Sequence, residues 1–255
     1  MKGYGKTLGT IKRRKWWSLL LGVVVVLLFC IMLIEGISNR AKMQVDTSQG
    51  LEIIKAAEEG DVTAVELKIQ SLDAQSQLGG DRSLKEIFAS AVIMGDSMAL
   101  GFAEYDVLNA SSVVADAGVS LTDLDEQIKK VKEINPQYIF MTYGLNDVVT
   151  TKGDEAKFAE QYKSAVKQIQ TELPNTRIFV NSLFTVQSKA AEKEAVYEKI
   201  EKYNQALQAL CDEQQIGFID NTVIVENSDY EEDGIHLKSP FYPRWAVHMA
   251  EVTSL

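Results

Sequence analysis

The sequence predicts a three-layer α/β/α sandwich around a central parallel sheet of about five strands, preceded by one transmembrane helix. Two observations predict the sandwich. Short apolar runs alternate with longer segments of helical periodicity, and most runs end close to Gly, Asn or Asp. Such runs are typical of strands buried on both faces, and their alternation with helices implies right-handed crossovers. A third observation, a charge-free stretch near the N-terminus, predicts the membrane helix.

The first 34 residues have the composition of a membrane anchor. Residues 1–15 carry six lysines and arginines and no acid, which predicts a basic cytoplasmic tail. Residues 16–34 contain no charge, and at about 1.5 Å per residue they nearly span a hydrocarbon layer of ~30 Å. A cleaved signal peptide is the alternative, but its apolar part is usually shorter. We therefore expect a single-pass protein of the cell membrane whose remaining domain is extracellular.

Residues 35–87 are expected to form a stalk that is largely helical. Apolar residues recur at roughly helical spacing from Leu51 to Leu72, and Gly79-Gly80-Asp81 then interrupts the pattern. A spacer between membrane and domain is the simplest interpretation. A helix that packs on the domain, or that pairs with another chain, is the alternative.

The predicted domain comprises residues 88–255. Five apolar runs are the expected strands, at 91–94, 113–115, 138–141, 177–180 and 216–219. Four amphipathic stretches are the expected helices, at about 120–134, 155–172, 188–214 and 239–252. In such folds ligands bind beyond the carboxyl ends of the strands, so the residues that follow the runs are the functional candidates.

Ser97 follows the first run, within Gly95-Asp96-Ser97, and is the candidate nucleophile. It stands where a strand turns into a helix, and the free N–H groups of a helix N-terminus can stabilise an oxyanion. A helix cap is the alternative role, because serine is a favoured capping residue.

The segment Asp233-Gly234-Ile235-His236 supplies a candidate general base and its partner. A serine hydroxyl becomes a good nucleophile when an adjacent base takes its proton, and His236 can do so. Asp233 lies three residues earlier, within reach of the imidazole. The alternative is a solvated acidic loop, because further carboxylates crowd this segment.

Two further residues are candidate oxyanion donors. Asn146, within Gly144-Leu145-Asn146-Asp147, would donate its side-chain amide, and Gly118 would donate its backbone N–H. A plain turn is the alternative for the segment around Asn146, because Gly, Asn and Asp all favour turns.

These segments resemble the four sequence blocks of the SGNH, or GDSL-type, hydrolases, over about residues 88–255. The resemblance implies a flavodoxin-like sandwich, a Ser97–His236–Asp233 triad, and an oxyanion hole made by Ser97, Gly118 and Asn146. Met98 stands where the family name has leucine, at a position that varies. An ordinary α/β-hydrolase fits less well, because the final glycine of G-x-S-x-G is absent.

The resemblance and the anchor together predict an outward-facing serine esterase that acts through an acyl-enzyme. The expected substrate is an O-acyl ester, O-acetyl above all, on a small molecule or a cell-surface glycan. An O-acyltransferase that works beside a membrane-bound acyltransferase is the alternative, and a non-catalytic glycan-binding domain is the third possibility. We expect no cofactor and no metal, because no Cys/His cluster or phosphate-binding glycine motif occurs. A net charge of −10 argues against nucleic acid as a partner.

Overall fold

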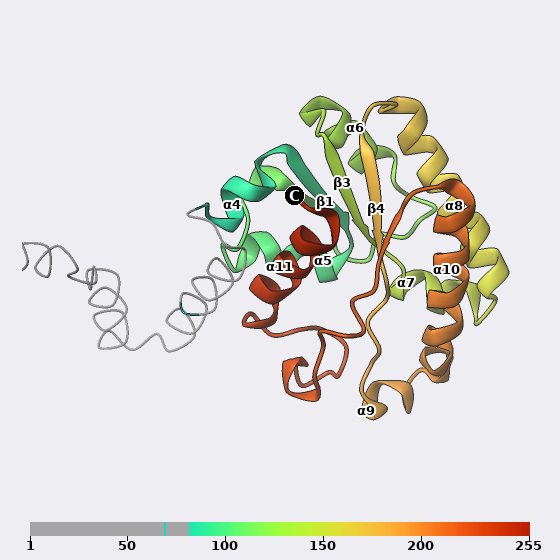
Figure 1. Cartoon of the computed structure of the whole chain (residues 1–255). Coiled ribbons are helices and arrows are strands. Elements are labelled where there is room, and N and C mark those ends of the chain that lie inside the picture. Colours follow the sequence, from blue (N-terminus) through green and yellow to red (C-terminus); the bar gives the residue numbers. More distant parts are fainter. Residues whose placement is uncertain (1–68, 70–81) are drawn as a thin grey trace, which may run out of the picture. The chain divides into compact units, whose positions relative to one another are not determined.

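Five parallel strands form the centre of the structure, a computed structural model that describes Ile69 and residues 82–255 (Figure 1). The sheet has the order β2-β1-β3-β4-β5. The strands are β1 (Ala91–Gly95), β2 (Val113–Ala115), β3 (Tyr138–Thr142), β4 (Arg177–Asn181) and β5 (Gly217–Ile219). Every neighbouring pair is parallel, so the predicted parallel sheet is confirmed.

The strands form where the sequence places its apolar runs. All five residues of β1 are buried, because helices cover both faces of the sheet at its centre. In the register of the sheet, Ile93 of β1 lies between Val113 of β2 and Phe140 of β3. Each observed strand lies within one residue of the expected run.

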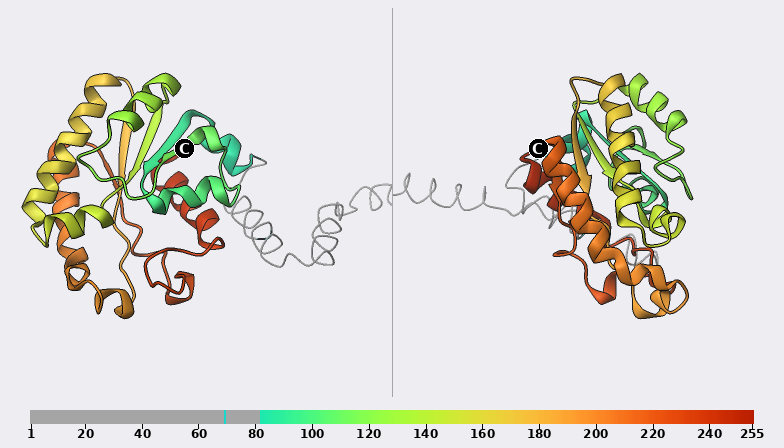
Figure 2. Two further views of the ribbon diagram at one scale, coloured as in Figure 1. Left: turned by 180° about the vertical axis from the view of Figure 1, so that it is seen from behind. Right: turned by 90° about the vertical axis from the view of Figure 1, so that its right-hand side faces the viewer.

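The helices form two layers. Those in the described part are α4 (Leu84–Ile87), α5 (Ser97–Glu104), α6 (Asp125–Ile134), α7 (Leu145–Thr151), α8 (Glu155–Glu172), α9 (Ser188–Ala191), α10 (Ile200–Gln214) and α11 (Phe241–Thr253). Helices α8 and α10 pack together on one face of the sheet, and α5 and α11 lie on the other (Figures 1 and 2). This arrangement is the expected α/β/α sandwich.

Three helices differ from the expectation. The stretch 188–214 is not one helix: α9 ends at Ala191, and a 3₁₀ turn over Ala195–Lys199 precedes α10. The helix expected from 120 begins at Asp125, because residues 116–124 form a loop. Helix α7 was not expected.

The described structure begins before residue 88. Ser83 caps α4 with its side chain, and Leu84 and Ile87 are buried in the same hydrophobic core as the sheet. The predicted tail (1–15) and transmembrane helix (16–34), and the predicted stalk up to residue 81 apart from Ile69, lie outside the described residues. Among the residues that are described, no helix combines the length and apolar character that a membrane crossing requires.

Candidate active site

The motif residues gather where the strand order reverses, between β1 and β3. Ser97 is the first residue of α5, directly beyond β1, and Asn146 is the second residue of α7, beyond β3. Gly118 lies in the turn that follows β2. In parallel sheets this reversal point is the usual place for a ligand site.

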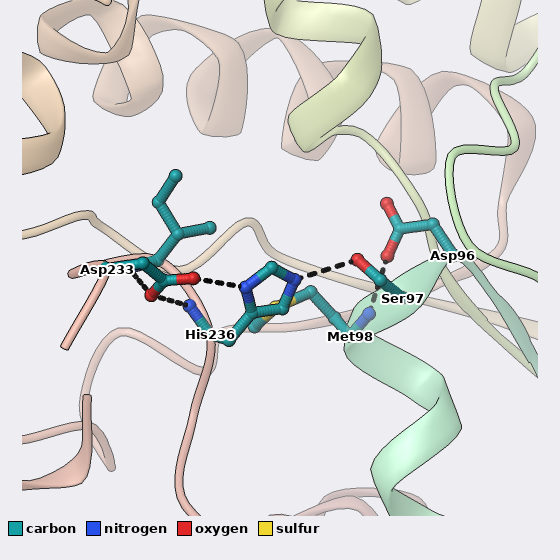
Figure 3. A network of polar contacts seen from close by, with 6 residues as sticks. Asp96, Ser97, Met98, Asp233 and His236 are labelled. Carbon is teal, nitrogen blue, oxygen red and sulfur yellow. Dashed lines mark hydrogen bonds and ion pairs between the residues drawn. The ribbon is translucent and has the colours of Figure 1, made fainter. Parts of the chain in front are cut away.

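A hydrogen-bonded chain joins Ser97, His236 and Asp233, although the last two are more than 130 residues from the serine (Figure 3). The Ser97 hydroxyl lies 3.1 Å from Nε2 of His236, and Nδ1 of the same ring lies 2.5 Å from Oδ2 of Asp233. An ionised carboxylate can only accept hydrogen bonds, so Nδ1 carries the proton. Nε2 is thereby left free to accept the proton of the serine hydroxyl.

The loop that carries these two residues is held by its own backbone. Oδ1 of Asp233 accepts hydrogen bonds from the backbone N–H groups of Ile235 and His236, at 2.8 and 3.0 Å. Gly234 has a φ of +75°, which permits this tight turn. Asp233 and His236 are therefore three residues apart because both belong to one closed turn.

Two residues that the sequence did not single out fix the loop to the rest of the molecule. The backbone N–H of Gln187 donates to the carbonyl of Gly234 at 2.9 Å. The hydroxyl of Tyr230 donates to the carbonyl of Thr185 at 2.6 Å. No local sequence signal points to either residue, because both contacts join segments that are distant along the chain.

Asp233, the acid of this hydrogen-bonded triad, is ionised, and its side chain is exposed to water. Burial alone would raise the pKa of Asp233, but hydrogen bonds from the His236 ring and from two backbone N–H groups hold it below its usual value. The side chains of His236 and Asp233 are 45% and 42% exposed. A large substrate can therefore reach this edge of the site.

Buried carboxylates lie on the other side of Ser97. Asp96 caps α5 by accepting a hydrogen bond from the N–H of Met98 at 3.0 Å, and Asp147 accepts one from Leu121 at 2.9 Å. Burial raises the pKa of each to about 6, and for Asp96 the charge of Asp147 adds to this effect. Oδ2 of Asp147 is buried without a hydrogen-bond partner in the described structure. Both residues thus hold loops of the site at a cost in desolvation.

The two remaining motif residues lie beside each other. Nδ2 of Asn146 donates to the carbonyl of Val119 at 3.0 Å, so the amide lies against the residue that follows Gly118. Gly118 has a φ of +78° and faces open space. Gly144 has a φ of +140°, and its missing side chain leaves room for Leu183 where the chain turns from β3 into α7.

A small, mainly apolar cavity adjoins the nucleophile turn. Its volume is about 20 Å³, enough for about one water molecule. Its lining includes both neighbours of Ser97 and residues beyond β3 and β4: Asp96, Met98, Thr142, Tyr143, Gly144, Leu145, Ser182, Leu183, Phe184 and Trp245.

Three aromatic residues and the second histidine of the chain, all in the C-terminal helix, make structural contacts. Phe241, Tyr242 and Trp245 are buried and pack α11 onto the domain, although Trp245 also lines the small cavity. His248 lies in α11, and its Nε2 pairs with the carbonyl of Asp220 at 2.9 Å. Within residues 82–255 and at Ile69, no group of His, Cys, Asp and Glu side chains is arranged to hold a metal ion.

The sequence profile of the GDSL-like Lipase/Acylhydrolase family matches residues 93–242. The chain belongs to this family. The GDSL-like match includes all five motif residues: Ser97, Gly118, Asn146, Asp233 and His236. As a GDSL-like acylhydrolase, the protein is a serine hydrolase that acts on ester bonds.

Solved structures described as GDSL-like lipases or as an acylhydrolase share the fold. An acylhydrolase from Bacteroides fragilis superposes with a TM-score of 0.53 and 16% identity, over 64% of this chain and 86% of that one. A GDSL-like lipase from Parabacteroides merdae gives 0.51 and 17%, over 65% and 96%. One from Bacteroides thetaiotaomicron gives 0.51 and 16%, over 64% and 87%. The comparison with curated proteins gives no match.

Proposed function

We propose that this GDSL-like hydrolase is a membrane-anchored, outward-facing esterase with a Ser97–His236–Asp233 triad. The observation that carries the proposal is the hydrogen-bonded chain from the Ser97 hydroxyl through His236 to Asp233. Its three members have the geometry that nucleophile, base and orienting acid require. The predicted segment 16–34 is the anchor.

The proposed reaction proceeds through an acyl-enzyme. Nε2 of His236 takes the proton from Ser97, whose Oγ attacks the ester carbonyl carbon. The backbone N–H groups of Ser97 and Gly118 and the amide of Asn146 stabilise the oxyanion. His236 then gives its proton to the departing alcohol, and a water that it deprotonates attacks the acyl-enzyme. Release of the acid restores the Ser97 hydroxyl.

The proposed substrate carries a short acyl group, acetyl above all, on a cell-surface glycan. The cavity lined by Asp96 and Met98, the two neighbours of Ser97, supports a short acyl chain, because it is small. The open edge at His236 and Asp233 supports a polymeric alcohol, because both side chains are more than 40% exposed.

An O-acyltransferase is the second candidate, and the same exposed edge favours it. A glycan hydroxyl that reaches the acyl-enzyme there could replace water as the acceptor. A membrane-bound acyltransferase would then be the partner that supplies the acyl group.

The test compares p-nitrophenyl acetate turnover by the full-length protein and its variants. Ser97→Ala and His236→Ala should each lose at least about 10³-fold in kcat/KM. His248→Ala is the matched control, because it removes the other histidine of the chain. Full activity in either triad variant would contradict the assignment. With an acetylated donor and a glycan acceptor both present, the ratio of acetate released to glycan acetylated separates esterase from transferase.

A further inference from the structure

The side chain of Gln127 lies among the three segments that lead to the nucleophile and the oxyanion donors. It belongs to α6 and is 2% exposed. Its Nε2 donates to the carbonyl of Gly95 at 3.2 Å and to Oδ2 of Asp116 at 3.0 Å, and its Oε1 accepts from the hydroxyl of Tyr143. These partners come from the ends of β1, β2 and β3.

Each partner lies two or three residues before a residue of the proposed site. Gly95 lies two residues before Ser97, Asp116 lies two residues before Gly118, and Tyr143 lies three residues before Asn146. One side chain therefore connects all three segments, through the backbone carbonyl of Gly95 and the side chains of Asp116 and Tyr143.

The chemistry of the contacts fixes the orientation of the amide. Two acceptors face its nitrogen and one donor faces its oxygen, so only one orientation of Gln127 satisfies all three partners. Burial raises the pKa of Tyr143 well above its usual value, so its hydroxyl keeps the proton that it donates. No other side chain of similar size offers two amide protons and an acceptor oxygen in one plane.

We propose that Gln127 is a positioning residue, which sets the distance between Ser97 and the oxyanion donors. The inference rests on the proposed esterase mechanism. Helix α7 already holds the far end of the Gly118 loop, through Asn146 to Val119 and Asp147 to Leu121. Gln127 holds the near end, at Asp116. A displacement of about 1 Å in such a site can cost 10²-fold in rate.

The test uses two variants of the full-length protein and one matched control. Gln127→Leu removes the whole network with little change in volume, and Tyr143→Phe removes one hydroxyl. Tyr203→Phe is the control, because it removes the hydroxyl of another fully buried tyrosine, which bonds Thr151 at 2.7 Å. We expect kcat to fall about 10–10²-fold for Gln127→Leu, and less for Tyr143→Phe, with KM within about twofold. Tyr203→Phe should stay within about twofold of wild type.

Gln127→Glu should make kcat depend on pH in a way that a loss of stability alone would not explain. The ionised carboxylate cannot donate, and it would face the Gly95 carbonyl and the Asp116 carboxylate, whose nearest cation is Lys130 at 3.6 Å. Two further carboxylates act on Tyr143 of the same network: Asp96 and Asp147. Protonation restores one donor, so kcat relative to wild type should rise as pH falls. A pH-independent ratio would contradict the proposal.

Hydrogen exchange separates failure of this inference from failure of the esterase assignment. If wild type does not hydrolyse esters, the assignment fails, and exchange of residues 116–121 still tests Gln127. These amides should exchange at least about tenfold faster in Gln127→Leu than in Tyr203→Phe. If kcat and exchange both match the control, Gln127 is not a positioning residue. Should Gln127→Leu fail to fold, Tyr143→Phe carries the same test.

Discussion

At the scale of single residues, the buried carboxylate of Asp96 lowers the stability of the fold. Its carboxylate is 2% exposed and its pKa is raised to about 6, against an ordinary value near 4. Because the folded state holds the proton to higher pH than the unfolded state, this group lowers stability as pH rises from about 4 to about 6. The penalty is then complete above that window and absent below it.

Asp96→Asn should therefore stabilise the protein at neutral pH. Asparagine keeps the oxygen that caps α5 and accepts from Met98, but it carries no charge to desolvate. We expect a gain on the order of 1–3 kcal/mol at about pH 7.5, shrinking to near zero at about pH 4.

Urea unfolding of the full-length protein at the two pH values measures this difference. Asp123→Asn, an exposed carboxylate in the nearby loop, is the control and should show no pH-dependent gain. A constant difference between Asp96→Asn and wild type at both pH values would contradict the account.

At the scale of elements, the contact of α5 with α11 holds the helix whose first residue is Ser97. Gly101 of α5 faces the ring of Tyr242, and a methyl group there would lie 2.2 Å from the ring carbon Cζ. The Tyr242 hydroxyl donates to the carbonyl of Met98 at 3.1 Å, one residue beyond the nucleophile. The glycine thus permits the close approach of the two helices.

Gly101→Ala should destabilise the protein, although alanine is the better helix former. The propensity gain is about 1 kcal/mol, whereas overpacking a buried contact costs about 1–3 kcal/mol. We expect a net loss of up to about 2 kcal/mol in urea unfolding. In a Tyr242→Ala background the same substitution should be neutral or stabilising, and an equal loss in both backgrounds would contradict the steric explanation.

The strands could be predicted from the sequence, whereas two helical details could not. Where short apolar runs alternate with helical stretches, a run such as 138–141 predicts a buried strand. The structure has β3 there, at Tyr138–Thr142. Helix α7 begins with Leu145 and Asn146 after a glycine and spans only seven residues, so its local signal is that of a turn. The sequence did not predict the break after α9, because apolar residues keep their helical spacing through it.

The site was predictable to the extent that its residues form short motifs. Ser97, His236 and Asp233 lie in contact as the motifs predicted. Gln127 was not predictable, because a glutamine in an amphipathic helix is ordinarily taken for an exposed residue. Its role depends on three strand ends that meet only in the folded sheet.

At the scale of the whole molecule, charge is distributed unevenly along the chain. Six cations and no acids occupy residues 1–15, while the whole chain carries 26 basic and 36 acidic residues. The positive-inside rule predicts that this tail stays in the cytoplasm and that residues 16–34 cross the membrane. The esterase domain would then act on substrates outside the cell.

Val25→Lys/Val26→Lys should release the protein from the membrane. Each lysine at the centre of a spanning helix costs about 2.5–3.5 kcal/mol of insertion free energy, and this stretch has no other charge to offset it. Wild type should pellet with membranes after an alkaline carbonate wash, and the double variant should not. Gln44→Lys/Gln49→Lys, which adds the same charge outside the stretch, should pellet like wild type. A soluble wild type would exclude the anchor.

The orientation is tested with protease added outside intact cells, which should remove a C-terminal epitope. An epitope that is protected would reverse the orientation.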